Sequence, residues 1–146
     1  MSSRACAEGR RTAAGRLSVG ADSLGRMPPR RRTPVAEGRA ALEECRAADW
    51  SADRRTTATA VRFTLEELST TAPGRTVEVR VPPYGAVQCI EGPVHTRGTP
   101  PNVIETDGVT WLRLAVGDLD WESALAGAMV RASGQRAHLH GLLPLL

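Results

Sequence analysis

The chain has 146 residues, and its 19 basic residues are all arginine, against 16 acidic residues. One domain is expected for this length, and such a domain buries about two-thirds of the surface that its unfolded chain exposes. Residues 1–32 hold eight arginines and two acids, a net of +6, whereas residues 33–146 hold eleven arginines and fourteen acids, a net of −3. The body is therefore mildly acidic, which argues against nucleic acid as a partner.

The arginine-rich residues 1–32 have no hydrophobic periodicity, and we expect them to form a disordered basic leader. Met27, followed by two prolines and three arginines, is a second candidate for the start of translation. The leader lacks the apolar stretch of a secretory signal, and no apolar run approaches the roughly 20 residues of a membrane span. Cys6, Cys45 and Cys89 are far apart, which argues against a disulfide framework. These features predict a cytoplasmic protein with a single domain over residues 33–146.

Two helices are predicted next. The first begins near Thr33 and Pro34, with Thr33 as its cap and the proline in its first turn. The second runs from about Asp53 to Thr70, with an apolar stripe at helical spacing. Phe63 lies off that stripe, so it either packs in the core or lines a cavity.

The hydrophobic period then changes from 3.6 to 2, which indicates strands. Residues 76–81 alternate valines with polar residues, and a turn made of two prolines, Tyr84 and Gly85 leads to a more apolar strand over residues 86–90. A rigid loop with prolines and glycines separates this strand from a short third strand at 103–105. Loops held by a rigid scaffold often carry function.

The C-terminal third predicts two helices and a hairpin. Asp107 or Thr106 can cap a helix that is apolar on most sides and ends at Gly117, and Asp118 or Asp120 can cap the next. Residues 130–133 and 137–143 then form two strands around a turn. In total we expect an α+β fold, with a five-stranded, mostly antiparallel sheet covered by helices.

This order of elements, with its residues, resembles the sterol carrier protein 2 family. The residues that carry the resemblance are Asp107, Leu114, Gly117-Asp118-Leu119, Ala124, Gly127, Val130, Gly134 and Leu139. It is clear over the last third of the chain and extends more weakly back to about Thr56. The whole body from Arg39 also resembles a branch of small bacterial proteins called sterol carrier family proteins, and residues 79–107 carry this narrower resemblance.

The resemblance implies a hydrophobic cavity between the sheet and the helices, with the C-terminal segment near its mouth. By that resemblance, the residues that line or close the cavity are Phe63, Tyr84, Trp111, Leu114, Leu142 and Leu146. Arg80, His95 and Arg97 could recognise a carboxylate or phosphate headgroup, because arginine suits bidentate contact with either; alternatively, Arg80 pairs with Glu78 or Glu91. The scarcity of aromatic residues favours a fatty acid, isoprenoid or acyl thioester over a sterol.

Two constellations could carry chemistry instead. Cys89, Glu91 and His95 could act as nucleophile, orienting carboxylate and base, although Cys89 is expected to pack inside a strand. His138 and His140 are two apart on a predicted strand and could bind a metal together with His95 or a carboxylate. No phosphate-binding loop, dinucleotide-binding glycine motif or zinc-protease motif is present in the sequence, so no cofactor is expected.

Three functional hypotheses follow. The first is non-catalytic binding of a small apolar ligand, as a carrier or sensor. The second is an accessory or protein-interaction domain with a filled core, which could form a homodimer through its C-terminal leucines. The third, and the least supported, is a small enzyme.

Overall fold

The structure, a computed structural model, describes residues 31–93 and 102–146. Its helices and strands are α1 (Val35–Ala47), α2 (Arg54–Thr71), β1 (Val77–Val81), β2 (Gly85–Cys89), β3 (Val103–Thr106), α3 (Gly108–Val116), α4 (Trp121–Ala126) and β4 (Val130–Ser133). The expected leader, apart from Arg31 and Arg32, lies outside the described residues, as do residues 94–101 of the proline-rich loop. The α+β class is confirmed.

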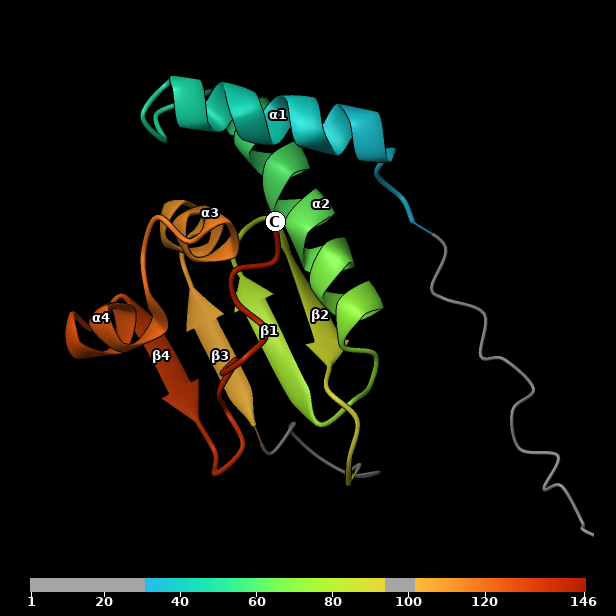
Figure 1. Cartoon of the computed structure of the whole chain (residues 1–146), viewed down its shortest axis with the longest axis vertical. Coiled ribbons are helices and arrows are strands. Elements are labelled where there is room, and N and C mark those ends of the chain that lie inside the picture. Colours follow the sequence, from blue (N-terminus) through green and yellow to red (C-terminus); the bar gives the residue numbers. More distant parts are fainter. Residues whose placement is uncertain (1–30, 94–101) are drawn as a thin grey trace, which may run out of the picture.

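The sheet has four strands in the order β2-β1-β3-β4 (Figure 1). β1 pairs antiparallel with β2, and β3 pairs antiparallel with β4, but β1 and β3 are parallel. The prediction of a mostly antiparallel sheet was therefore wrong at its centre. β2 and β3 lie on opposite sides of β1, and β3 runs in the same direction as β1.

The predicted fifth strand over residues 137–143 is absent from the structure. The N–H of Leu142 donates to the carbonyl oxygen of Leu139 within a local turn (3.1 Å), and the N–H of Leu145 donates to the carbonyl oxygen of Ala115 in α3 (2.8 Å). Gly141, with a φ of 73°, reverses the backbone in the left-handed region that glycine favours. The backbone of residues 137–146, here called the C-terminal segment, thus bonds within turns and to a helix rather than to the edge of β4.

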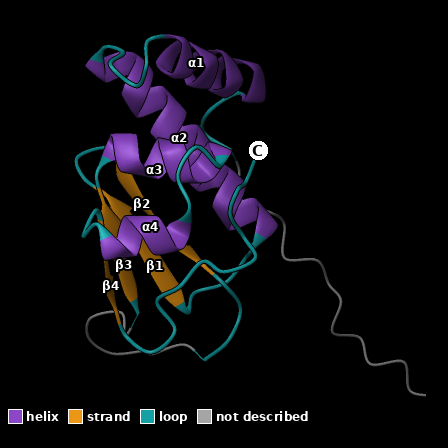
Figure 2. Ribbon diagram, turned by 60° about the vertical axis from the view of Figure 1, so that its left-hand side comes forward, coloured by secondary structure: helices purple, strands orange, loops and turns teal. Residues whose placement is uncertain are grey.

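The helices cover one face of the sheet (Figures 1 and 2). α2, α3 and the C-terminal segment lie over the same face in both views (Figures 1 and 2). The three valines of β1 are buried on this face, and Glu78 and Arg80, which alternate with them, lie on the opposite face. α1 packs against α2, at the end of the molecule away from β4.

Three aspartates begin helices. Asp53 accepts the backbone N–H groups of Arg55 and Thr56, and Asp107 and Asp120 cap α3 and α4 in the same manner. At the other end of α3, Gly117 has a φ of 80°. These helix boundaries agree with those predicted from the sequence. Of the alternative caps predicted there, Asp107 caps α3 rather than Thr106, and Asp120 caps α4 rather than Asp118.

The start of α1 differs from the expectation. Its N-cap residue is Pro34, without a side-chain cap, so Thr33 does not have the predicted role. Instead, the carboxylate of Glu66 on α2 accepts the backbone N–H groups of Arg32 and Thr33, each at 3.1 Å. The chain before α1 is therefore attached to α2. Among the described residues, no helix is long and apolar enough to cross a membrane.

Candidate functional site

The C-terminal segment lies against the end of α3. The backbone N–H groups of both Leu145 and Leu146 donate to the carbonyl oxygen of Ala115, the second at 3.3 Å. Pro144 packs beside Gly117, where an added Cβ atom would make an ordinary van der Waals contact with the proline ring (3.4 Å). The hydrogen bonds at Ala115 use a carbonyl oxygen of the last turn of α3, which has no partner inside the helix.

A cavity of about 220 Å³ lies between this segment, α3 and the start of α4. It is lined by Leu114, Gly117, Leu119, Asp120, Trp121, Leu139, His140, Gly141, Leu143 and Pro144. Leu114 and Leu139 are each 1% exposed, so they form a dry floor, whereas His140 and Gly141 are exposed. The cavity thus has an apolar interior beneath an exposed rim.

Trp121, which lines this cavity, carries an unusual polar group. The residue is 7% exposed, and its indole Nε1 is buried without a hydrogen-bond partner among the described residues. It is the one buried side-chain nitrogen or oxygen there that lacks a partner. A buried donor without an acceptor costs about 1–3 kcal/mol, so such a group calls for an explanation. A bound ligand with an acceptor oxygen would be one.

The ionisable groups at this cavity are Asp120 and His140. Asp120 caps α4, and hydrogen bonds from the side chain and backbone N–H of Ser123 lower the pKa of its carboxyl group. It therefore remains a carboxylate at neutral pH. Nε2 of His140 lies 3.5 Å from the carboxylate of Glu122. His140 lines the cavity, whereas Glu122 does not. The fixed charge beside the cavity is thus negative.

The residues expected at a lipid cavity do not all lie together. Phe63 and Trp111 are fully buried, and Nε1 of Trp111 donates to the hydroxyl oxygen of Thr64 at 2.8 Å. Both side chains fill the core between helices. Leu114 alone among the six apolar residues lines the cavity beneath the C-terminal segment.

The remaining apolar residues of that set are spread out. The ring of Tyr84 packs against the start of α3, where a Cβ atom on Gly108 would come within 2.7 Å of it. Leu142 is half-buried and packs against the core, and Leu146 is 43% exposed. The neighbouring Leu143, rather than Leu142, lines the cavity.

The expected headgroup residues are not gathered at this cavity. Nε of Arg80 lies 2.5 Å from the carboxylate of Glu78, on the face of the sheet that the helices leave uncovered. This is the ion pair that the sequence offered as the alternative for Arg80. His95 and Arg97 lie outside the described residues.

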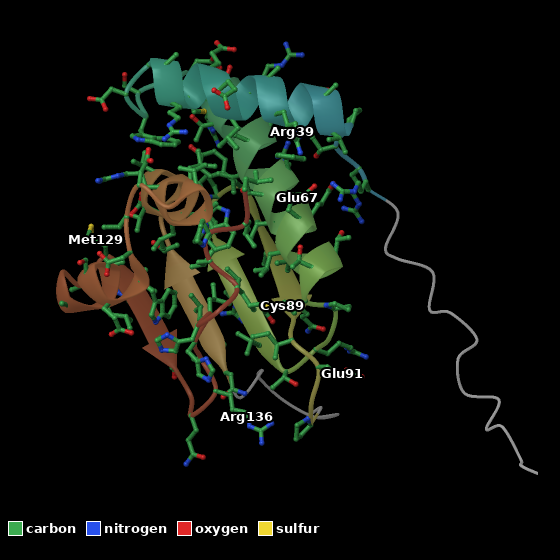
Figure 3. All side chains as sticks on the ribbon, in the orientation of Figure 1. Arg39, Glu67, Cys89, Glu91, Met129 and Arg136 are labelled. Atoms are coloured by element: carbon green, nitrogen blue, oxygen red, sulfur yellow. The ribbon has the colours of Figure 1, made fainter. Side chains whose placement is uncertain are left out.

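The cysteine constellation lacks a reactive thiol. Cys89 is fully buried on β2, where burial raises the pKa of its thiol to about 12, and Glu91 is exposed beyond the end of the strand (Figure 3). A thiol with that pKa is almost entirely protonated at neutral pH, whereas a nucleophile must be a thiolate. Cys45 is also buried, and burial raises its pKa as well.

We expect Cys89 to resist alkylation in the folded protein. Iodoacetamide at pH 8 should modify Cys89 only after denaturant is added, because both exposure and ionisation of the thiol require unfolding. Mass spectrometry of proteolytic peptides measures each cysteine separately. Complete modification of Cys89 in the native protein within minutes would contradict the burial of this strand.

The two histidines lie close together, but not on a strand. Their ring centroids are 5.2 Å apart, on the irregular C-terminal segment. No group of three or more residues able to hold a metal ion occurs among the described residues. The idea that His138 and His140 share one face of a strand was wrong, because no strand forms there.

Sequence reasoning missed most of this cavity. It treated Trp121 as part of a helix face and residues 137–143 as a strand, so the residues on the two sides of the cavity were never placed opposite each other. Leu119 and Trp121 lie at the end of α3 beside the C-terminal segment, and no local pattern in the sequence pairs them with it.

Comparison with known proteins assigns the chain to a family. None of the curated proteins matches the sequence. A family model described as a bacterial SCP ortholog matches residues 53–145, which is well over half of the chain and includes every strand and α2, α3 and α4. The chain therefore belongs to the SCP-like family of bacterial SCP orthologs.

Proposed function

We propose that the protein binds the acyl part of a neutral ester or thioester in the cavity between α3, α4 and the C-terminal segment. The observation that carries the proposal is the buried, unpartnered indole Nε1 of Trp121 beside an apolar floor. Small-ligand sites commonly combine apolar walls with a few polar groups that fix orientation. Membership of an SCP-like family supports a lipid-binding role.

The size of the cavity limits the ligand. A cavity of about 150 Å³ holds a benzene molecule, and ordinary ligand pockets hold roughly 300–1,000 Å³. The space of about 220 Å³ lies between these values. It therefore suits a short acyl chain or one end of a longer chain, and is too small for a whole sterol.

The charge beside the cavity favours a neutral headgroup. A fatty-acid carboxylate would face the carboxylate of Asp120, and like charges at short range repel each other. A carbonyl oxygen of an ester or thioester can accept the N–H of Trp121 without that repulsion, once the side chains that bury Nε1 shift on binding. Among the ligands considered from the sequence, an acyl thioester fits better than a free fatty acid.

The test compares two ligands with the same chain. Isothermal titration of the full chain with the octanoyl thioester of N-acetylcysteamine should show binding, and octanoate should bind at least about tenfold more weakly. Shortening the acyl chain from eight to six carbons should weaken binding about fourfold per methylene, because each buried CH₂ contributes about 0.8 kcal/mol. Equal affinity for both ligands would contradict the role of Asp120.

Two variants locate the site. Trp121→Phe removes the indole N–H but keeps an aromatic ring. It should weaken binding of the thioester while leaving the free protein folded, because Nε1 makes no hydrogen bond that the substitution would remove. Trp50→Phe is the matched control, since Trp50 lines a different pocket. Unchanged affinity in Trp121→Phe, or absence of thioester binding by the unaltered protein, would overturn the proposal. The homodimer considered from the sequence remains a separate prediction.

A further inference from the structure

A second hollow, an open groove of about 880 Å³, lies between α2 and β2. One wall is α2 and the other is β2 with the turn before it; the two lie side by side in Figures 1 and 2. It is lined by Arg31, Arg32, Arg62, Leu65, Glu66, Ser69, Tyr84, Gly85, Ala86 and Val87. The groove shares no residue with the cavity proposed for the acyl group.

β2 is an edge strand, and its outer edge has free backbone groups. Glu78 of β1 donates its N–H to the carbonyl oxygen of Asn102, towards β3 (2.9 Å). Backbone groups alternate sides along a strand, so the residues of β1 that flank Glu78 bond to β2, where one partner is Val87. The same alternation turns the N–H and C=O groups of Ala86 and Gln88 outward.

The N–H of Ile90, two residues after Gln88, also points outward, as this alternation requires. Ile90 donates to the carbonyl oxygen of Ala72 at the end of α2 (2.8 Å). That bond closes one end of the edge. Between it and the turn at Tyr84, Ala86 and Gln88 make no backbone hydrogen bond on their outer side within the described parts of the chain. Such an edge is a template for another extended segment.

The charge of the groove is positive although the folded body is acidic. Arg31 pairs with Glu67, and that hydrogen bond raises the pKa of the guanidinium. Arg32 and Arg62 have no acidic partner among the described side chains, although Nε of Arg62 donates to the carbonyl oxygen of Tyr84 (3.3 Å). Both therefore keep donors for an anionic partner.

We infer that this groove binds an extended acidic peptide segment of a partner protein, which adds to the outer edge of β2. The peptide backbone would pair with Ala86 and Gln88, its apolar side chains would lie on Leu65 and Val87, and its acidic side chains would meet Arg32 and Arg62. Strand addition with pockets for alternate side chains is a recurring mode of peptide recognition. A five-residue edge spans about 17 Å, which sets the length of the bound segment.

Pairing of β2 with a second copy of itself fits less well. Two copies joined at this edge would bring both sets of Arg32 and Arg62 into one interface, while Glu66, the acidic residue of the groove lining, already accepts the backbone N–H groups of Arg32 and Thr33. Like charges across an interface oppose association. A separate, acidic segment compensates these charges, which is why the partner is assigned as a different chain.

The test uses a fluorescein-labelled peptide of alternating valine and glutamate, six residues long, and fluorescence anisotropy of the full chain. Two other peptides serve as controls, one with lysine in place of glutamate and one with N-methyl groups on alternate backbone nitrogens. The acidic peptide should bind at least about tenfold more tightly than either control, because one lacks the opposite charge and the other lacks backbone donors. Equal binding of the N-methylated peptide would overturn strand addition.

Variants of the protein test whether the peptide binds in this groove. Arg62→Glu should weaken binding about tenfold or more, and Arg39→Glu, with the same change in total charge, should alter it less than about twofold, since Arg39 is an exposed residue of α1 (Figure 3). Ala86→Pro removes one outward N–H and should abolish binding. Proline is tolerated on an edge strand where the N–H faces solvent, so this variant should remain folded.

Other outcomes decide against the proposal. Equal losses in Arg62→Glu and Arg39→Glu would show that only the total charge matters. Dimerisation of the free protein that Ala86→Pro abolishes, without peptide binding, would identify a second copy as the occupant. Binding of anionic phosphatidylglycerol vesicles that Arg62→Glu abolishes, again without peptide binding, would identify a membrane surface instead.

Discussion

Replacing Trp111 with alanine is expected to lower the free energy of unfolding by about 3–5 kcal/mol, the range for large aromatic residues in a core. The indole is fully buried between α3 and α2, and Nε1 donates to the hydroxyl oxygen of Thr64 at 2.8 Å. That hydroxyl also donates within α2, to the carbonyl oxygen of Ala60 (2.9 Å). The substitution therefore removes both packing and a hydrogen bond that joins the two helices.

Three further variants separate the two contributions. Trp111→Phe keeps most of the packing, and Thr64→Val leaves the indole N–H without an acceptor; each should cost about 1–3 kcal/mol. The double variant should cost less than the sum of the two, since neither partner is then left unpaired. Urea unfolding followed by circular dichroism measures all four variants. A loss below 1 kcal/mol for Trp111→Ala would mean that the core around α3 is not filled as described.

The helices and the first four strands could be predicted because their signals are local. An aspartate before each of α2, α3 and α4 accepts N–H groups of the first turn, and this requires only residues within three positions. The alternation of β1 is equally local, because one face of that strand is buried and the other is not.

The pairing of the strands is not local, and it was predicted less well. Nothing within β3 specifies a parallel neighbour, since its four residues would fit either direction. The last segment has alternating apolar residues that suit a strand, but its N–H groups bond to Leu139 and Ala115 instead. A tertiary contact with α3 thus decides its conformation.

The candidate site depended on that same segment, so it could not be found from the sequence. Leu114 was assigned to a cavity from the resemblance, and it does line one. Its neighbours there, Leu139 and Leu143, come from the part of the chain whose structure was predicted wrongly. The groove beside β2 was missed for another reason: knowing that β2 is an edge strand requires the order of the whole sheet.

Gly38→Ala is expected to destabilise the protein, although alanine is the better residue inside a helix by about 1 kcal/mol. A Cβ atom at Gly38 would stand 2.2 Å from Cγ of Phe63, which is fully buried on α2. Overpacking of a core typically costs about 1–3 kcal/mol, and here it must exceed the gain in helix propensity. Gly38, which weakens α1 in isolation, is thus the point at which α1 approaches α2.

The sign of this effect should depend on Phe63. In a Phe63→Ala background the obstructing ring is gone, so Gly38→Ala should no longer destabilise and should become neutral or stabilising by up to about 1 kcal/mol. Ala40→Gly on the exposed side of α1 is the matched control, and it should cost about 0.5–1 kcal/mol through propensity alone. Chemical unfolding of the four variants measures the coupling. If Gly38→Ala has the same cost with and without the ring of Phe63, the contact between α1 and α2 is not the one that decides stability at this position.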